Sequence, residues 1–257
     1  MGENLNEMPL VGHLRELKQR LIKSLLAVGV AFIFTYTWSE GLYNVLTKPL
    51  FAVLPADAKY IIFTGLGEPF FIYLEAGIAG AVIAASPFLL YQMWAFIAPG
   101  LHANERRWFI SLLAGSFLLF WAGVLFAYFI VFPFAFRYLM GFSGPGLRPY
   151  ISMGLYFSSS VKMLLAFGAI FQLPLLMLVV SSIGLISART LALYWRYAVV
   201  LCFIIGAILT PPDVFSQILM SVPLVILYGL GVFLAFVFGK KKEEEAGTSG
   251  LKEGKSL

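Results

Sequence analysis

Two acidic side chains, Glu16 and Glu105, are the residues of this sequence best suited to chemistry. Glu105 follows the apolar, aromatic-rich run 86–98 and precedes Arg106 and Arg107, so it lies at the boundary of a hydrophobic segment. An ionised carboxylate at such a boundary costs free energy unless it has a partner or a function. Two separated carboxylates among basic residues predict a receptor for a ligand with two cations. Arginine suits such a receptor better than lysine, because its planar fork makes two parallel hydrogen bonds to a carboxylate.

Both acids also have purely structural interpretations. Glu16 lies four residues before Arg20 in the segment 13–21, which has helical periodicity. An i,i+4 ion pair there would contribute about 0.2–0.5 kcal/mol. Glu105 follows Asn104 at the start of an apolar run, where an acid complements the exposed amides of a first helical turn. The pattern alone leaves the structural and the receptor interpretations open.

The composition identifies an integral membrane protein. Of the 257 residues, 60% are hydrophobic and 12% are charged, against about 25% charged residues in a soluble domain. The apolar runs are continuous and not alternating, which excludes a β-barrel. A span needs about 20 apolar residues, so we predict an all-α polytopic fold with six transmembrane helices in one domain over residues 1–239. The predicted spans are Leu21–Trp38, Pro69–Ala98, Trp108–Phe132, Tyr156–Ile186, Tyr197–Thr210 and Phe215–Phe238.

Six spans put both termini on one side of the membrane, and the distribution of positive charge selects the side. Eleven Lys and Arg residues flank the side of the termini, and five flank the other. The eleven are Arg15, Lys18, Arg20, Lys23, Arg106, Arg107, Arg189, Arg196, Lys240, Lys241 and Lys242, and the five are Lys48, Lys59, Arg137, Arg148 and Lys162. The positive-inside rule then predicts that both termini are cytoplasmic, in a bacterial inner membrane.

The connections between the spans carry further predictions. Two long outer loops, 39–68 and 133–155, contain prolines and glycines and are predicted to fold into caps. The fifth span is short, since about 14 residues of helix cover only about 21 Å. The segment 240–257 is polar, with Lys-Lys-Lys followed by Glu-Glu-Glu. We predict that it is disordered, and its sequence leaves open whether all of it is native.

The residue inventory argues against enzymatic and metal chemistry. Cys202 is the only cysteine and lies within an apolar run, while His13 and His102 both lie in polar boundary segments. A serine motif around Ser143 superficially resembles that of an intramembrane protease, but both histidines are predicted on the opposite membrane face, out of reach of that serine. We therefore expect no enzyme, no cofactor, no metal site and no nucleic-acid ligand.

Three parts of the chain resemble the TatC family, the receptor subunits of the twin-arginine protein translocase. They are His13-Leu-Arg-Glu-Leu-Lys-Gln-Arg-Leu21, the run Pro87-Phe-Leu-Leu-Tyr-Gln-Met-Trp-Ala-Phe-Ile-Ala-Pro-Gly-Leu101 followed by Glu105-Arg-Arg107, and Thr210-Pro-Pro-Asp213 with Ser216-Gln217. The resemblance covers the chain apart from its tail. It implies recognition of twin-arginine signal peptides of folded exported proteins. It also implies a multi-copy complex in membrane lipid with the single-span subunits TatB and TatA, driven by the proton-motive force.

The resemblance assigns roles to individual residues. By position it implies that two acids contact the twin-arginine motif, with a basic residue beside them, and it marks other functionally sensitive positions on both faces. The two acids are Glu16 and Glu105, the basic residue is Lys18, and the others are Phe96 on the cytoplasmic face and Pro49 and Asp213 on the outer face.

Gln172 departs from the family pattern. The family commonly has glutamate at this position, near the middle of the fourth span, whereas glutamine cannot ionise. Pro174 leaves the carbonyl of Ile170 without its usual donor, so Gln172 is predicted either to satisfy that carbonyl or to bond a neighbouring helix or partner. A secondary transporter of a small solute is the alternative function. It would need internal repeats and discontinuous helices around a midplane site, and no convincing repeat is found.

Overall fold

The computed structural model describes residues 8–55, 60–97, 106–142, 150–209 and 214–239. Within these ranges the extended secondary structure is helical, and a single isolated β-bridge joins Ile62 to Ser152. The helices are α1 (Met8–Thr37), α2 (Ser39–Phe51), α3 (Glu68–Ile97), α4 (Arg106–Phe126), the π-helical turn η4 (Ala127–Val131), α5 (Phe132–Met140), α6 (Met153–Ile170), α7 (Leu173–Ser182), α8 (Ala188–Leu193), α9 (Trp195–Leu209) and α10 (Val214–Phe238). The all-α prediction is confirmed.

Five helical stretches are long and apolar enough to cross a membrane, and α9 is a sixth, shorter one. The five are Gly12–Thr37, Glu68–Ile97, Phe109–Met140, Met153–Ser182 and Gln217–Phe238. The 15 residues of α9 reach about 22 Å, as expected for the short fifth span. The lead-in segment 13–21 is not separate from the first span, because α1 runs through both without a break.

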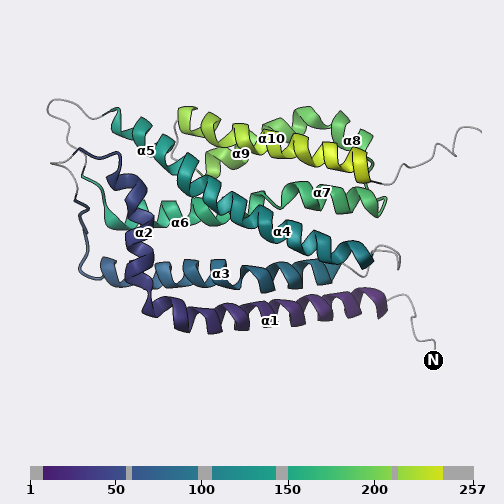
Figure 1. The fold of residues 1–257 in the computed structure, drawn as a ribbon, viewed down its shortest axis with the longest axis horizontal. Coiled ribbons are helices and arrows are strands. Elements are labelled where there is room, and N and C mark those ends of the chain that lie inside the picture. The colour runs from purple at the N-terminus through teal and green to yellow at the C-terminus, as the bar shows by residue number, and fades with distance from the viewer. Residues whose placement is uncertain (1–7, 56–59, 98–105, 143–149, 210–213, 240–257) are drawn as a thin grey trace, which may run out of the picture.

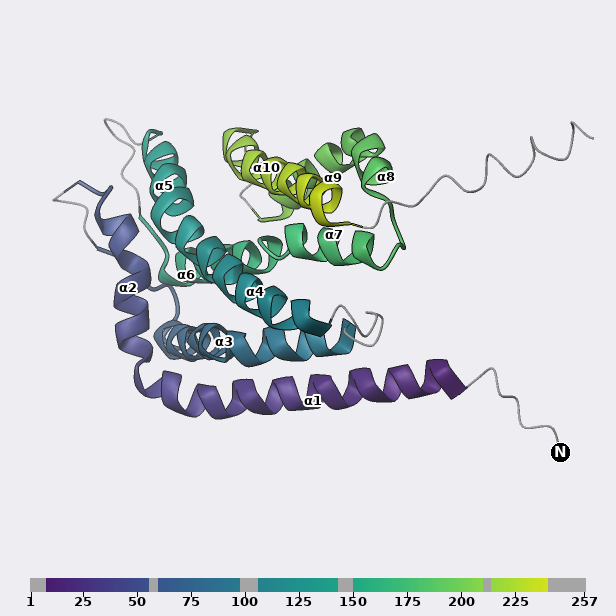
Figure 2. The same ribbon diagram turned by 45° about the vertical axis from the view of Figure 1, so that its right-hand side comes forward.

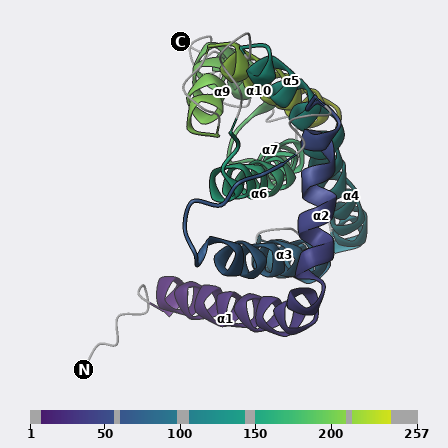
Figure 3. The same cartoon turned by 90° about the vertical axis from the view of Figure 1, so that its left-hand side faces the viewer.

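The helices form a curved layer with α1 at one edge and α8 and α9 at the other. Figure 1 shows α1 beside α3, followed by α4 and α6, with α7 against α10. Figure 2 shows the same succession from another side, and Figure 3 shows α2 crossing the ends of several helices. The start of α1 and the end of α10 lie at the same end of the molecule (Figure 1), as an even number of spans requires.

The prediction that the second outer loop begins at residue 133 is wrong, because the third span continues through η4 into α5 and ends at Met140. Pro133 lacks an amide hydrogen and would break an ordinary α-helix. Here the turn before it widens, and the amide of Phe132 donates to the carbonyl of Ala127, five residues earlier. A π-turn of this kind accommodates the proline without ending the helix.

The apolar stretch Met153–Ser182 covers most of the predicted fourth span, Tyr156–Ile186, but it consists of two helices. α6 ends at Ile170, and α7 begins at Leu173 with Pro174 in its first turn. The amide of Gln172 donates to the carbonyl of Ala169 at 3.0 Å, which tightens the last turn of α6. Proline is tolerated in a first helical turn, where its missing donor is not needed, so a break here is less costly than a continuous helix.

The described parts of the first predicted outer loop, 39–55 and 60–68, are folded, as predicted. α2 forms the first 13 residues of this loop, and Pro49 is buried in that helix. The end of the loop is held by Glu68, whose carboxylate accepts hydrogen bonds from the amides of Thr64, Gly65 and Gly154. Since Gly154 lies in the first turn of α6, Glu68 ties the outer loop to the start of the fourth span.

Candidate functional site

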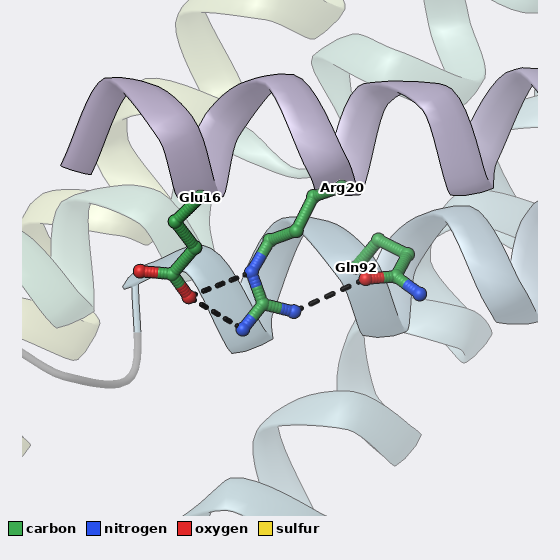
Figure 4. A network of polar contacts seen from close by, with 3 residues as sticks. All are labelled: Glu16, Arg20 and Gln92. Atoms are coloured by element: carbon green, nitrogen blue, oxygen red, sulfur yellow. Dashed lines mark hydrogen bonds and ion pairs between the residues drawn. The ribbon is translucent and has the colours of Figure 1, made fainter. Parts of the chain in front are cut away.

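The first turns of α1 pack against the last turns of α3, and this contact brings together side chains far apart in the sequence. The rings of His13 and Phe96 stack, with centroids 4.2 Å apart and planes inclined by 19°. Next to this stack, Arg20 links Glu16 to Gln92 (Figure 4). His13, Glu16 and Arg20 are spaced by three and four residues and therefore share one face of α1.

Arg20 donates two hydrogen bonds to one carboxylate oxygen of Glu16. Its Nε and Nη2 donate to Oε1 of Glu16 at 2.9 and 2.7 Å, and its Nη1 donates to Oε1 of Gln92 at 3.1 Å. The i,i+4 ion pair allowed by the sequence is confirmed, and it extends to a second helix. Figure 4 shows the other carboxylate oxygen of Glu16 turned away from the guanidinium. Acceptors on two helices, the carboxylate of Glu16 on α1 and the amide oxygen of Gln92 on α3, thus hold one guanidinium group between them.

The guanidinium site, which is formed by Glu16 and Gln92, is buried on the side of Gln92 and partly exposed on the side of Glu16. Gln92 is 6% exposed, so the packing of α3 fixes its carbonyl oxygen. The side chains of Glu16 and Arg20 are 32% and 23% exposed, so a ligand can reach the carboxylate from solvent. Partial exposure also keeps the ion pair weak enough to exchange, because water competes for both charges.

Lys18 does not join this group. It is exposed, and two residues of helix turn it about 200° away from Glu16. Phe96, by contrast, lies on the α1–α3 contact through its stack on His13. Of the residues assigned to signal-peptide binding, the structure therefore brings Glu16 and Phe96 to one site and leaves Lys18 on another face of α1.

Two of the assigned residues, Glu105 and Asp213, lie outside the described residues. α3 ends at Ile97 and α4 begins at Arg106, so the connection that contains Glu105 joins the same end of α3 that carries Phe96 and Gln92. The proposed pairing of Glu105 with Glu16 stays a prediction. The functional assignment of Pro49 also stays a prediction.

Gln172 bonds a neighbouring helix, one of its two predicted arrangements. Its Oε1 accepts a hydrogen bond from the hydroxyl of Ser116 on α4, and its Nε2 donates to the carbonyl of Ser116 at 3.1 Å and to that of Gly168 at 3.5 Å. The carbonyl that it reaches in its own span is thus that of Gly168, not that of Ile170. With an exposure of 4%, Gln172 joins the break between α6 and α7 to α4.

Apolar side chains flank the guanidinium site on both helices. Leu14, Leu17 and Leu21 form an exposed apolar stripe on α1, in agreement with the helical periodicity of the segment 13–21. On α3, Phe88 and Tyr91 are 39% and 43% exposed, within a turn of Gln92. A chain that carries a cation followed by an apolar segment could therefore contact both kinds of surface.

Sequence reasoning missed two members of this site, His13 and Gln92. Gln92 carries a signal that could have been used, because it is a lone amide in an apolar run and stands four residues before Phe96. This spacing places the two on one face of α3. Within the described ranges, no group of three or more His, Cys, Asp or Glu side chains could hold a metal ion.

Comparisons with known proteins all lead to one family. Residues 12–223 match the family model described as Sec-independent protein translocase protein (TatC). A TatC protein from Desulforapulum autotrophicum is 42% identical over 249 residues, which cover 96% of this chain and 92% of the relative. A TatC protein from Aquifex aeolicus is 40% identical over 239 residues, which cover 92% of this chain and 98% of the relative.

Solved structures agree with the sequence comparisons. A crystal structure of a twin arginine translocase receptor, TatC, superposes with a TM-score of 0.80 at 39% sequence identity, over 88% of this chain and 98% of that protein. A second crystal structure of the receptor, in the detergent DDM, gives a TM-score of 0.80 over 87% of this chain and 99% of that protein.

Proposed function

Because this chain belongs to the TatC family of Sec-independent protein translocase proteins, we propose that it is the receptor subunit of a twin-arginine translocase. In this role it recognises twin-arginine signal peptides of folded proteins and nucleates assembly of the translocation complex. The alternative function, transport of a small solute, has no comparable support. At the broken fourth span, the polar groups of Gln172 are already bonded to α4.

The observation that carries the proposal is that the α1–α3 contact already holds a guanidinium group. The carboxylate of Glu16 and the carbonyl oxygen of Gln92 accept hydrogen bonds from three nitrogen atoms of one guanidinium. An arginine of a signal peptide presents the same donors in the same plane. One arginine of the pair therefore binds at Glu16, and the second binds at Glu105.

The energetics divide recognition between charge and apolar contact. A hydrogen bond to a charged group contributes about 1.5–3 kcal/mol, so the arginine pair alone gives weak affinity. Burial of apolar surface contributes roughly 25 cal/mol per Å². The apolar segment of the signal peptide supplies much of the remainder by lying along the exposed aromatic side chains of α3, among them Phe88 and Tyr91.

The setting of this receptor follows from the family and from the charge distribution. We place the chain in the bacterial inner membrane with both termini in the cytoplasm, the side on which the Lys and Arg residues gather. TatB and TatA are its partners in a multi-copy complex that uses the proton-motive force. Binding involves no covalent chemistry, so this subunit acts as a receptor and not as an enzyme.

An equilibrium titration tests the proposal. The purified protein in detergent is titrated with a signal peptide that contains Arg-Arg and with the same peptide containing Lys-Lys. We expect Glu16→Gln and Glu105→Gln each to weaken binding of the Arg-Arg peptide and to reduce the preference over Lys-Lys. Glu40→Gln on α2, at the opposite end of the bundle, is the control and should change neither. Unchanged affinity and unchanged preference in both site variants would refute the assignment.

A further inference from the structure

The guanidinium in the α1–α3 site belongs to the protein itself. Arg20 occupies the carboxylate of Glu16 and the carbonyl oxygen of Gln92, the groups that the proposed function assigns to an arginine of the signal peptide. We propose that Arg20 is an internal competitor that a signal-peptide arginine must displace from Glu16. This inference rests on the proposed function and adds a regulatory element to it.

The geometry favours occupancy of a binding site over an ordinary surface ion pair. An i,i+4 pair needs only the two residues of one helix, yet Arg20 directs a third nitrogen across to Gln92 on α3. Gln92 is nearly buried, so its oxygen is fixed before the guanidinium arrives. Arg20 thus fills a preformed pair of acceptors, as a ligand would.

The competitor can leave because the site is partly exposed. The side chain of Arg20 retains 23% of its accessible surface and that of Glu16 retains 32%. A displaced Arg20 therefore has solvent to enter when it releases Glu16 and Gln92. Exchange of one guanidinium for another then costs little, because the incoming group replaces the bonds that the outgoing group loses.

Competition by Arg20 has a quantitative consequence for ligand affinity and specificity. If the site is competent only when Arg20 has left it, the apparent dissociation constant of every ligand is raised by the same factor, the inverse of the competent fraction. Removal of Arg20 should therefore tighten binding of an Arg-Arg peptide and a Lys-Lys peptide equally. The ratio of the two affinities stays the same. In the wild-type protein, the raised apparent dissociation constant leaves only a small fraction of sites occupied by a weak ligand.

The experiment compares Arg20→Gln with Arg15→Gln by equilibrium titration of full-length protein with both peptides. Arg15 is an exposed arginine on the same helix, so its removal measures the general effect of one lost positive charge on a cationic ligand. We expect Arg20→Gln to lower both dissociation constants by about three- to tenfold. This factor corresponds to a wild-type protein in which about one third to one tenth of the sites are free of Arg20. Arg15→Gln should change them by less than about twofold.

Two further variants separate the possible explanations. Arg20→Lys keeps the charge but lacks the fork, so its gain should be smaller than that of Arg20→Gln. In the double variant Glu16→Gln, Arg20→Gln the gain should vanish, because the contested carboxylate is gone. Each variant is first checked for monodispersity, and Arg20→Lys carries the test if Arg20→Gln does not fold.

The outcomes distinguish this inference from the proposed function. Weaker or unchanged binding in Arg20→Gln, or a gain no larger than that of Arg15→Gln, contradicts the competitor role of Arg20. The proposed receptor function is unaffected by that result. A gain confined to the Arg-Arg peptide also contradicts the competitor role, because competition by Arg20 lowers the fraction of competent sites equally for both peptides. If the wild-type protein shows no preference for Arg-Arg over Lys-Lys, the proposed function itself fails.

Discussion

Loss of Glu68 should disturb the end of the bundle where α2 and the starts of α3 and α6 meet. Oε2 of Glu68 accepts hydrogen bonds from the amide and hydroxyl of Thr64 at 2.6 and 3.0 Å and from the amide of Gly65 at 3.3 Å. Its Oε1 accepts from the amide of Gly154 at 2.5 Å and from the hydroxyl of Ser152 at 3.1 Å. The amides of a first helical turn have no partner within the helix, so a carboxylate from α3 supplies one to α6.

The magnitude follows from the exposure of these bonds. The three bonds to Thr64 and Gly65 are exposed, so water can replace them and their loss has a small effect. The two bonds to Ser152 and Gly154 are partly buried, so water replaces them less well and their loss has a larger effect. Glu68→Ala should therefore destabilise the start of α6 more than the segment 60–68, and Glu68→Gln, which keeps one acceptor oxygen, should destabilise both less than Glu68→Ala does.

Hydrogen exchange with mass spectrometry measures this effect where it occurs. Peptides covering 60–68 and 150–157 should both exchange faster in Glu68→Ala, by about tenfold or more in 150–157, and by a smaller factor in Glu68→Gln, because local opening exposes their amides to solvent. Glu40→Ala, which removes an exposed acid of α2, is the control. Unchanged exchange in both segments of Glu68→Ala would show that the carboxylate does not hold the cap.

Three other changes test the remaining parts of the structure. Gln172→Leu and Ser116→Ala should each lower the thermal midpoint, and a double-mutant cycle should give a coupling of about 0.6–1.7 kcal/mol, as for other interhelical bonds in membranes; additive losses would contradict the pair. Gly123→Ala places a methyl group 2.5 Å from a backbone oxygen of α6, whereas Gly29→Ala meets nothing within 4 Å. The first should therefore lose about 1–3 kcal/mol in a thermal or chemical unfolding assay, and equal stability of the two variants would argue against close helix packing. Phe96→Leu removes the stack that fixes the start of α1, so signal-peptide titration should show about two- to tenfold weaker binding at an unchanged thermal midpoint; unaltered binding would remove this residue from the site.

The spans could be predicted from the sequence because each depends on local hydrophobicity. A continuous apolar run must be helical in lipid, since every backbone polar group needs an internal partner there. The short α9 was predictable for the same reason, because its length is simply the length of its apolar run. The end of the third span was not predictable, because Pro133 is normally a terminating signal and only the widened turn before it lets the helix continue.

The candidate site could be predicted only as far as spacing within one helix allows. Glu16 and Arg20 stand four residues apart, so their ion pair follows from the sequence. The contribution of Gln92 depends on how α1 and α3 align, and so does the stack of His13 on Phe96. The partners in these two contacts are 72 and 83 residues apart in the chain, and no local pattern specifies their alignment.

Gln172 performs a task that a carboxylate at the same position could not. Its amide nitrogen donates to two backbone carbonyls while its oxygen accepts from the hydroxyl of Ser116. An ionised glutamate has no donor, and a protonated one has a single donor. Either would lose at least one of these two side-chain hydrogen bonds, and the ionised form would place a charge inside the membrane domain. In this chain, hydrogen bonds of Gln172 therefore hold the junction of α6, α7 and α4 together. Because glutamine does not ionise, the side chain at position 172 cannot bind or release a proton during transport.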